Sequence, residues 1–203
     1  APTLISPGRL SHRLLAQGDR RSFASVIASL TLRRELVEME RVDQAVRMEM
    51  IRDGVGTPSP ELLIRMAAID VKNTRRLQEI VAGHGWPSPD LVGQDGAGAA
   101  FILLQHASYD AQKALFPLVE AGYRDGTVPG QSYALLLDSI LVWEGKPQVY
   151  GSKARPVDEW VDGEPTFWPI DDEADVDRRR AEVGLSPLAE YREMLKRLNF
   201  PDE

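Results

Sequence analysis

Apolar residues recur at intervals of three and four along most of the chain, which is the spacing of one face of an α-helix. Two long stretches with this spacing cover residues 20–53 and residues 60–82, and a short segment rich in glycine and proline separates them. Glycine leaves a helix easily and proline cannot continue one, so the pattern predicts a helical hairpin over about residues 20–83. Ser59 followed by Pro60 has the residue types of a helix N-cap and a first helical position.

The rest of the chain is also helical by pattern, except for one region. Helical spacing returns over about residues 96–144, and two short helices are expected within residues 173–198. Residues 145–170 lack that spacing and carry short β-branched and aromatic runs on either side of a turn that contains glycine and proline. We therefore predict a mainly α, bundle-like single domain over residues 1–203, with a small β-hairpin or an ordered loop near residues 148–170.

The most informative positions are polar residues that interrupt the apolar helix faces. Asp43 follows Leu36 and Met39 and precedes Val46 and Met50 in steps of three and four, so it shares their face. The other interruptions are Asp70 and Asn73 in the second predicted helix, His106 in the third with Asp110 one turn further along, and Asp138 in the Leu-rich helix near residues 131–143. Because an uncompensated buried carboxylate is very costly, we expect several of these groups to meet in one polar pocket between helices.

These side chains suit general acid/base catalysis. His106 is the principal candidate, because imidazole gains and loses a proton near neutral pH, and Asp43 or Asp70 would orient it. Arg47 lies four residues after Asp43, so it is a natural ion-pair partner that can also hold an anionic group. Further candidates for substrate contact are Asn73 and Asp110. The alternative is a set of separate structural hydrogen bonds that fix the register of the helices.

A second constellation is the segment Gly145-Lys146-Pro147-Gln148-Val149-Tyr150-Gly151. Lys146 can neutralise an anionic ligand, Gln148 can donate and accept hydrogen bonds, and Tyr150 can donate a proton or stack on a ligand. Arg179, in an acid- and arginine-rich segment, can reach a substrate carboxylate or a core aspartate. The alternative is a capped helix end followed by an edge strand, with the arginines serving ordinary helix-dipole chemistry.

Composition narrows the classes of function. The 203 residues include no cysteine, which excludes disulfides, thiolate metal sites and a cysteine nucleophile. A net charge of −7 argues against generic nucleic-acid binding, and no run reaches the roughly 18 apolar residues of a membrane helix. Residues 154–203 hold seven basic and fourteen acidic residues, which favours a solvated surface or a contact with a protein partner. The first residues lack an export-signal pattern, so we expect a cytoplasmic location, although a processed signal would leave the same start.

Metal and serine chemistry have weaker support. Two carboxylates and a histidine can bind Zn, Fe or Mn, but the His-Glu-x-x-His and paired Glu-x-x-His signatures are missing. Gly-x-Ser-x-Gly is missing as well, so nothing indicates a serine triad. We therefore expect no cofactor and no metal ligands, and an Asp/His metalloenzyme stays as an alternative.

Several of these motifs, in this order, resemble one protein family. They are Asp43-Gln44-x-x-Arg47, Asp70-x-x-Asn73-Thr74, Gly85-Trp86-Pro87, Gln105-His106-Ala107, the Gly145–Gly151 segment, and Val176-Asp177-x-Arg179 followed by Gly184-Leu185-x-Pro187-Leu188. The chain resembles a widespread bacterial family catalogued only as a domain of unknown function, over roughly residues 33–195. The resemblance implies no established activity. Ser108 stands where the family usually has an acid, and Ser152-Lys153 stand where it often has Thr-Gln.

The leading hypothesis is an acid/base enzyme without a redox cofactor, a hydrolase, lyase or cyclase that acts on a small polar molecule or a peptide. The main alternative is a protein-interaction or immunity-type binding module. Its working surface would be the acidic C-terminal section with Trp160, Phe167 and Trp168 as exposed aromatic anchors.

Overall fold

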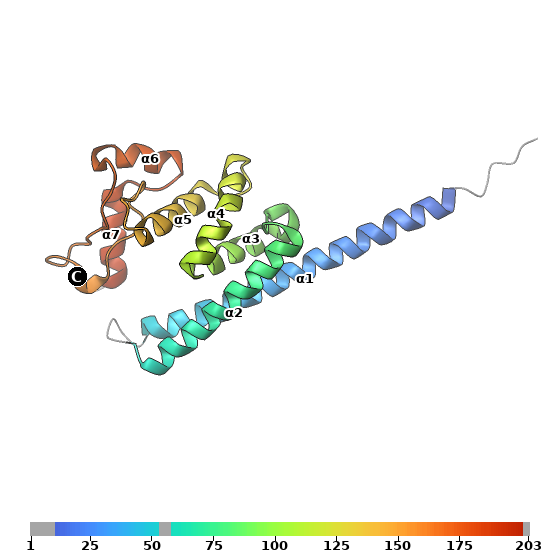
Figure 1. Ribbon diagram of the computed structural model, residues 1–203, viewed down its shortest axis with the longest axis horizontal. Coiled ribbons are helices and arrows are strands. Elements are labelled where there is room, and N and C mark those ends of the chain that lie inside the picture. Colours follow the sequence, from blue (N-terminus) through green and yellow to red (C-terminus); the bar gives the residue numbers. More distant parts are fainter. Residues whose placement is uncertain (1–10, 53–57, 201–203) are drawn as a thin grey trace, which may run out of the picture.

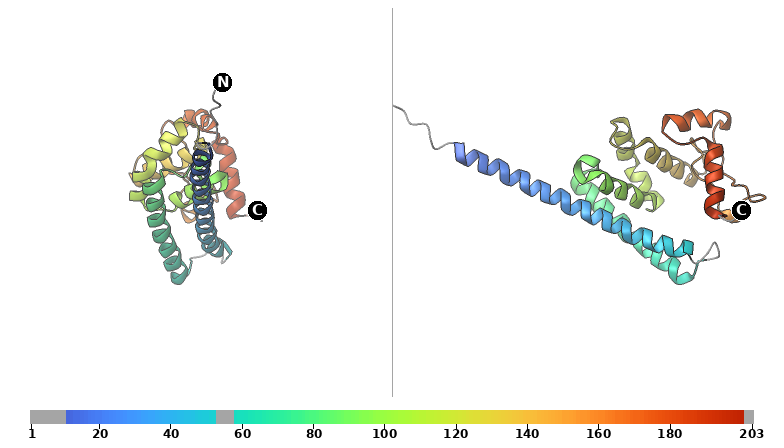
Figure 2. Two further views of the ribbon diagram at one scale, coloured as in Figure 1. Left: turned by 90° about the vertical axis from the view of Figure 1, so that its right-hand side faces the viewer. Right: turned by 180° about the vertical axis from the view of Figure 1, so that it is seen from behind.

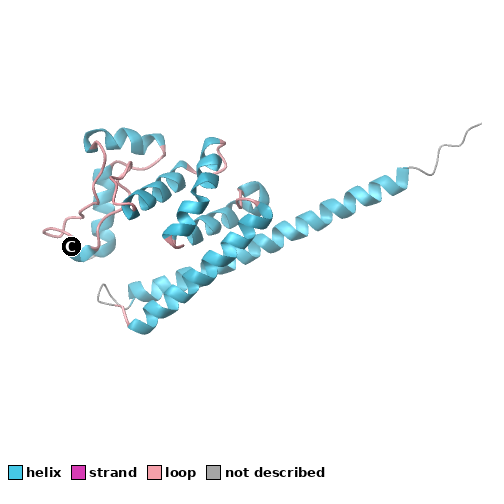
Figure 3. Cartoon of the chain, in the orientation of Figure 1, coloured by secondary structure: helices cyan, strands magenta, loops and turns pink. Residues whose placement is uncertain are grey.

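Seven α-helices and two short 3-10 helices make up the part of the chain that the structure describes, and loops join them without a β-strand (Figure 3). The structure is a computed structural model that describes the backbone of residues 11–52 and 58–200, and the side chains of residues 23–50 and 58–200. The helices are α1 (Ser11–Arg52), α2 (Pro60–His84), α3 (Pro89–Gln105), α4 (Tyr109–Arg124), α5 (Gly130–Trp143), η1 (Val157–Glu159), η2 (Glu173–Asp175), α6 (Val176–Glu182) and α7 (Leu188–Asn199). The predicted mainly α fold is therefore confirmed. No described helix has the length and apolar character needed to cross a membrane.

Helices α1 and α2 form the predicted hairpin. They run alongside each other in opposite directions, and the first half of α1 projects well beyond the rest of the molecule (Figures 1 and 2). Leu32 and Leu36 of α1 and Leu77 and Ile80 of α2 are buried in the main apolar core. Because the buried residues follow the three-and-four spacing, each helix turns one face inward along the length of the hairpin.

The ends of α2 explain why its limits are readable from the sequence. The Ser59 hydroxyl accepts a hydrogen bond from the Leu62 N–H at 3.2 Å, and Pro60 occupies the first helical position. Gly85 follows the helix with φ 76°, in the left-handed region that favours glycine.

Helix α3 packs closely against α1 because its N-terminal half carries small residues. A Cβ on Gly96 would lie 2.9 Å from the Val92 Cβ and 3.4 Å from the Arg33 Cγ, so only glycine fits without a shift. Gly93, with φ 74°, kinks the helix. The helix begins at Pro89 and continues across this kink, so its start lies several residues before the predicted one near residue 96.

Helices α4 and α5 continue the core away from the hairpin (Figure 1). Val119 of α4 and Leu136 of α5 are fully buried with Leu103 and Leu104 of α3. Beyond them, α6 and α7 lie at the far end of the molecule from the projecting half of α1, so the fold is elongated.

The predicted β-hairpin near residues 148–170 is wrong, and the ordered loop is what the structure contains. Isolated bridges join Gln148 to Ile170, Ala154 to Phe167 and Val161 to Glu164, and none extends into a ladder. The backbone here is extended, as its residue types predicted, but side chains bind many of its N–H and C=O groups. A second strand therefore has no continuous edge to pair with.

Candidate functional site

Three helices bring four of the candidate side chains together. Asp43 and Arg47 lie one turn apart on α1, Asp70 lies on α2, and His106 is the residue that follows α3. The Arg47 guanidinium contacts the other three side chains. These four residues are called the His106 cluster below.

A buried carboxylate holds the imidazole. His106 Nδ1 lies 2.8 Å from Asp43 Oδ2, and the Asp43 side chain is only 1% exposed whereas that of His106 is 24% exposed. Burial acts to raise the pKa of Asp43, but the hydrogen bonds and charges of His106 and Arg47 outweigh it, so the pKa lies below its usual value. We therefore assign the Nδ1 proton to a hydrogen bond that His106 donates to an ionised Asp43. In neutral imidazole this leaves Nε2 as the nitrogen that can accept a proton.

Arg47 joins the two carboxylates. Its Nη2 donates to Asp70 Oδ1 at 2.5 Å and to Asp43 Oδ1 at 3.3 Å, and its Nε lies 3.0 Å from His106 Nδ1. Nδ1 cannot accept from Arg47 while it donates to Asp43, so the shorter contact to Asp43 determines the proton position. Burial raises the pKa of Asp70, and Arg47 offsets only part of that rise. The two aspartates thus have opposite pKa shifts within one cluster.

Two glutamines that are not among the predicted site residues support the cluster. Gln44 Nε2 donates to Asp43 Oδ2 at 3.0 Å. Gln112, buried on α4, donates to the carbonyl oxygens of Gln105 and Ala107 at 2.9 and 3.0 Å, so it fixes the backbone on both sides of His106. A polar residue on an amphipathic helix gives no sequence signal for such a role, because its partners are backbone atoms of another segment.

Asn73 and Asp110 lie apart from the hydrogen bonds of the His106 cluster. Asn73 is buried on α2 one turn beyond Asp70, and it lines a groove between α1 and α2. Asp110 is exposed in the first turn of α4.

The segment 145–153 is held in place mostly by side chains that bind backbone atoms. Gln148 is fully buried, donates to the carbonyl oxygens of Lys153 and Trp168, and accepts from the Lys153 N–H at 2.7 Å. Arg179 Nε donates to the Val149 carbonyl at 2.8 Å, and its Nη2 donates to backbone carbonyls at 171 and 172. Both side chains therefore use their polar atoms on the fold, which favours the structural alternative for these two substrate-binding candidates.

Two buried charged side chains also bind the backbone of this segment. The Asp138 carboxylate accepts from the backbone N–H groups of Val149, Tyr150 and Ser152 at 2.8–3.2 Å. Arg180, 1% exposed, donates to the Tyr150 carbonyl at 2.7 Å. We call Asp138, Gln148, Arg179 and Arg180 the loop clamp. Arg180 is not among the predicted site residues, because it belongs to a run of charged residues, which is typical of a solvated surface.

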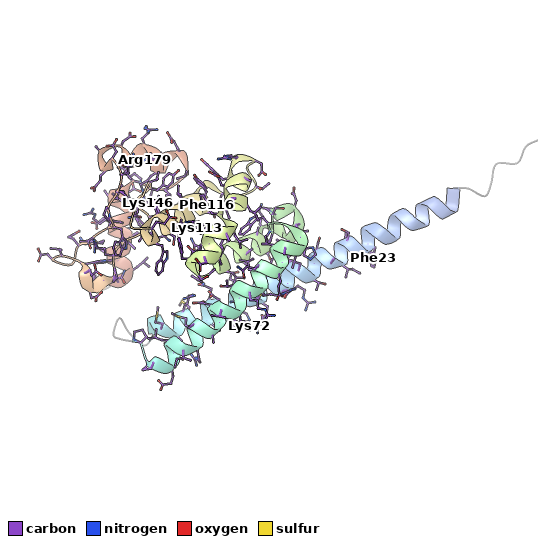
Figure 4. All side chains as sticks on the ribbon, viewed as in Figure 1. Phe23, Lys72, Lys113, Phe116, Lys146 and Arg179 are labelled. Carbon is purple, nitrogen blue, oxygen red and sulfur yellow. The ribbon has the colours of Figure 1, made fainter. Side chains whose placement is uncertain are left out.

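Lys146 and Tyr150, the other two candidates of this segment, have different surroundings. Tyr150 is half-buried beside Tyr133, and burial raises the pKa of its hydroxyl to about 12, so it is a poor proton donor at neutral pH. Lys146 is exposed and lies 2.6 Å from Glu144, which also accepts from Lys113 at 2.8 Å and from the Tyr109 hydroxyl at 2.9 Å. The hydrogen bonds from these donors, led by Lys113, lower the pKa of Glu144 to about 2. Figure 4 shows Lys113 and Lys146 in the same part of the molecule.

A family model described as "Family of unknown function (DUF6624)" matches residues 30–199. The chain belongs to this family. The match covers nearly the whole described chain, including the His106 cluster and the loop clamp. Comparison with curated proteins and with solved structures gives no match.

The structure gives local accounts of Ser108 and Lys153, two positions where the resemblance led us to expect other residues. Ser108 caps α4, and its hydroxyl accepts from the Ala111 N–H at 3.4 Å. An acid caps a helix in the same way, so the change keeps the turn that carries His106. Lys153 has its pKa lowered by burial, and its backbone N–H and C=O bind Gln148.

A metal has no ready ligand set in the part of the chain that the structure describes. No group of three or more His, Asp or Glu side chains is placed to bind one there. Within the His106 cluster, Arg47 lies between the two aspartates, where its positive charge would oppose a cation.

Proposed function

We propose that the protein is an acid/base enzyme, of hydrolase, lyase or cyclase type, that acts on a small polar molecule or a peptide. The observation that carries this proposal is the 2.8 Å contact between His106 Nδ1 and the sealed carboxylate of Asp43. A buried carboxylate that binds one imidazole nitrogen fixes the ring and leaves the other nitrogen for proton transfer.

Each member of the His106 cluster has a distinct role in this proposal. His106 Nε2 takes a proton from the substrate or from water and returns it later in the reaction, and Asp43 stabilises the imidazolium formed in between. Arg47 holds Asp43 in place and can bind an oxygen that becomes negative during the reaction. Asp70 accepts from Arg47 at 2.5 Å, so it orients the guanidinium beside Asp43.

The substrate side of the site is the surface formed by Tyr109, Lys113, Trp143 and Lys146. Tyr109 follows His106 by three residues, so their Cα atoms lie within about 11 Å of each other. Trp143 is 68% exposed, and its ring centre lies 6.5 Å from that of Tyr109. Lys113 and Lys146, with Glu144 between them, give this surface a net positive charge, which suits a substrate with an anionic group.

The change His106→Asn tests the proposal with the smallest structural loss. The asparagine amide nitrogen can take the place of Nδ1 and donate to Asp43, but the group at Nε2 is lost. The variant and the wild type are incubated with a mixture of cell metabolites and short peptides, and mass spectrometry follows the products. We expect turnover at least about 100-fold slower in the variant, because one acid/base group contributes about 10²–10⁴-fold.

His84→Asn is the matched control, because His84 is an exposed residue at the end of α2. It should behave as the wild type does. Turnover by His106→Asn within a factor of two of the wild type would remove the assignment. Nitrogen NMR of the ring gives a substrate-free check, in which neutral His106 should carry its proton on Nδ1.

The interaction-module alternative now rests on a different surface. Its predicted anchors are packed rather than exposed. The Trp160 ring contacts Phe200, and the Trp168 ring lies under the Arg155 guanidinium at 4.4 Å. Phe167 is likewise half-buried, against Tyr191.

The projecting half of α1 is the surface that favours this alternative. Phe23 lies on it (Figure 4), and the exposed apolar stripe continues along the helix through Val26, Ile27 and Leu30. Loss of biological function in a Phe23→Glu/Ile27→Glu variant, with a harmless His106→Asn, would favour the binding module over the enzyme.

A further inference from the structure

A groove between α1 and α2 has the size of a small-molecule site. Its volume is about 600 Å³, and all its lining residues come from residues 35–39 of α1 and 68–79 of α2. Ligand pockets in proteins typically have about 300–1,000 Å³. Neither His106 nor any residue of α3 lines the groove, so it is separate from the proposed catalytic group.

A buried amide in the groove lacks a partner. Asn73 is 6% exposed and lines the groove, and its Nδ2 has no hydrogen-bond partner within the described residues. Leaving such a donor unsatisfied costs about 1–3 kcal/mol relative to an apolar side chain of similar shape. Leu77 and Ile80 lie on the same face of α2, so leucine at position 73 would suit the packing. An acceptor atom of a bound ligand would account for the asparagine.

Each glutamate that lines the groove is paired with an arginine, and one lining lysine has no ion-pair partner among the described residues. Glu35 pairs with Arg76, Glu79 with Arg75 and Arg76, and Glu38 with Arg41. Lys72, which Figure 4 labels on α2, is the lining cation for which residues 23–50 and 58–200 provide no ion-pair partner. The lining itself balances three glutamates against three cations, so the groove combines a buried N–H donor with one lysine unpaired in the described chain rather than with a net positive charge.

The remaining lining is apolar. Met39 of α1 and Ala68 and Val71 of α2 contribute aliphatic surface, and Val71 is 71% exposed although it is a large apolar residue. A ligand with a hydrocarbon part would cover this surface and remove it from water.

We propose that this groove binds a small carboxylate with an aliphatic tail. One carboxylate oxygen accepts from Asn73 Nδ2, Lys72 balances the charge, and the tail lies along Met39, Ala68 and Val71. A carboxylate fits better than a phosphate, because the groove offers one buried donor and one unpaired cation rather than a ring of donors. This site does not depend on the chemistry proposed for His106.

Calorimetric titration of the full chain with octanoate tests the proposal. We expect saturable binding with a Kd in the millimolar range or tighter. Asn73→Leu should weaken it by at least about tenfold and Lys72→Gln by about threefold, because the first change removes the donor and the second removes the charge. Octan-1-ol, which has the tail without the carboxylate, should bind more weakly than octanoate.

Arg124→Gln is the matched control, since it removes an exposed cation at the end of α4 that lies outside both the groove and the proposed substrate surface, and it should leave octanoate binding unchanged. A thermal melt shows that Asn73→Leu is folded, and Asn73→Asp, which keeps the shape but repels a carboxylate, repeats the test if it is not. Absent octanoate binding in the wild type, equal binding of octan-1-ol, or full binding by both the Asn73 and the Lys72 variants would overturn the proposal.

Discussion

The His106 cluster and the loop clamp are both polar networks built from charged side chains, but they differ in what those side chains bind. In the loop clamp, Asp138, Gln148 and Arg180 are almost completely buried and bind backbone N–H and C=O groups. In the His106 cluster, by contrast, Asp43 binds the side chains of His106 and Arg47.

This difference distinguishes the polar residues that hold the fold from those that we propose for catalysis. A side chain whose polar atoms are used by the backbone holds a loop and has no free atom for a ligand. A cluster that is sealed on one side and exposed on the other keeps a group free to exchange protons. The sealed Asp43 and the partly exposed His106 have this arrangement, and the same comparison places Asp138 with the fold.

The largest effect we predict follows from removing the centre of the loop clamp. Asp138→Leu leaves three backbone N–H groups without an acceptor, of which that of Ser152 is buried, so we expect a loss of about 3–6 kcal/mol in the free energy of unfolding. Chemical denaturation measures it. Asp138→Asn keeps one acceptor oxygen and should lose less. If Asp138→Leu costs under about 1 kcal/mol, the clamp does not hold the loop in the way we describe.

Local signals made the helical hairpin and the His106 cluster predictable. Ser59, Pro60 and Gly85 act within one turn of their own positions, so the limits of α2 are visible in the sequence. Asp43 and His106 stand out because a polar residue on an apolar face requires a partner. The pattern gave the face of each residue, and the packing of α1, α2 and α3 supplied the contact.

The features that the sequence hid depend on partners far away in the chain. The predicted start of α3 is too late, because Gly93 lies inside the helix and the glycine-rich run around it resembles a loop. The residues of 148–170 favour extended backbone, but Gln148 and Asp138 take up the hydrogen bonds that a strand would share with its neighbour. Buried Arg180 and exposed Arg178 belong to the same run of three arginines, and their different burial depends on how α6 packs against the rest of the chain.

A smaller effect is expected in how the stability contributed by each aspartate of the His106 cluster depends on pH. The lowered pKa of Asp43 means that its ionised form stabilises the fold, so this stability is present above the ordinary aspartate pKa and is lost as the pH falls through the lowered value. The raised pKa of Asp70 has the opposite sign, so its contribution is present at low pH and is lost as the pH rises through the raised value.

Urea denaturation of the wild type, Asp43→Asn and Asp70→Asn from about pH 3 to pH 7 measures this difference. The stability of the wild type relative to Asp43→Asn should rise with pH, and its stability relative to Asp70→Asn should fall. Parallel curves for the two variants would mean that Arg47 does not divide the cluster into two environments.

The smallest structural effect is expected at Lys146, because this residue belongs to neither the His106 cluster nor the loop clamp. Its ammonium is exposed, and Lys113 and Tyr109 still bind Glu144 when it is removed. Lys146→Ala should therefore change the melting temperature by less than about 2 °C, because an exposed ion pair contributes little. If this surface binds the anionic part of a substrate, the same variant should raise KM while kcat stays near the wild-type value. A fall in kcat with unchanged KM would instead indicate that Lys146 acts on the reaction itself, and a large loss of stability would assign it to the fold.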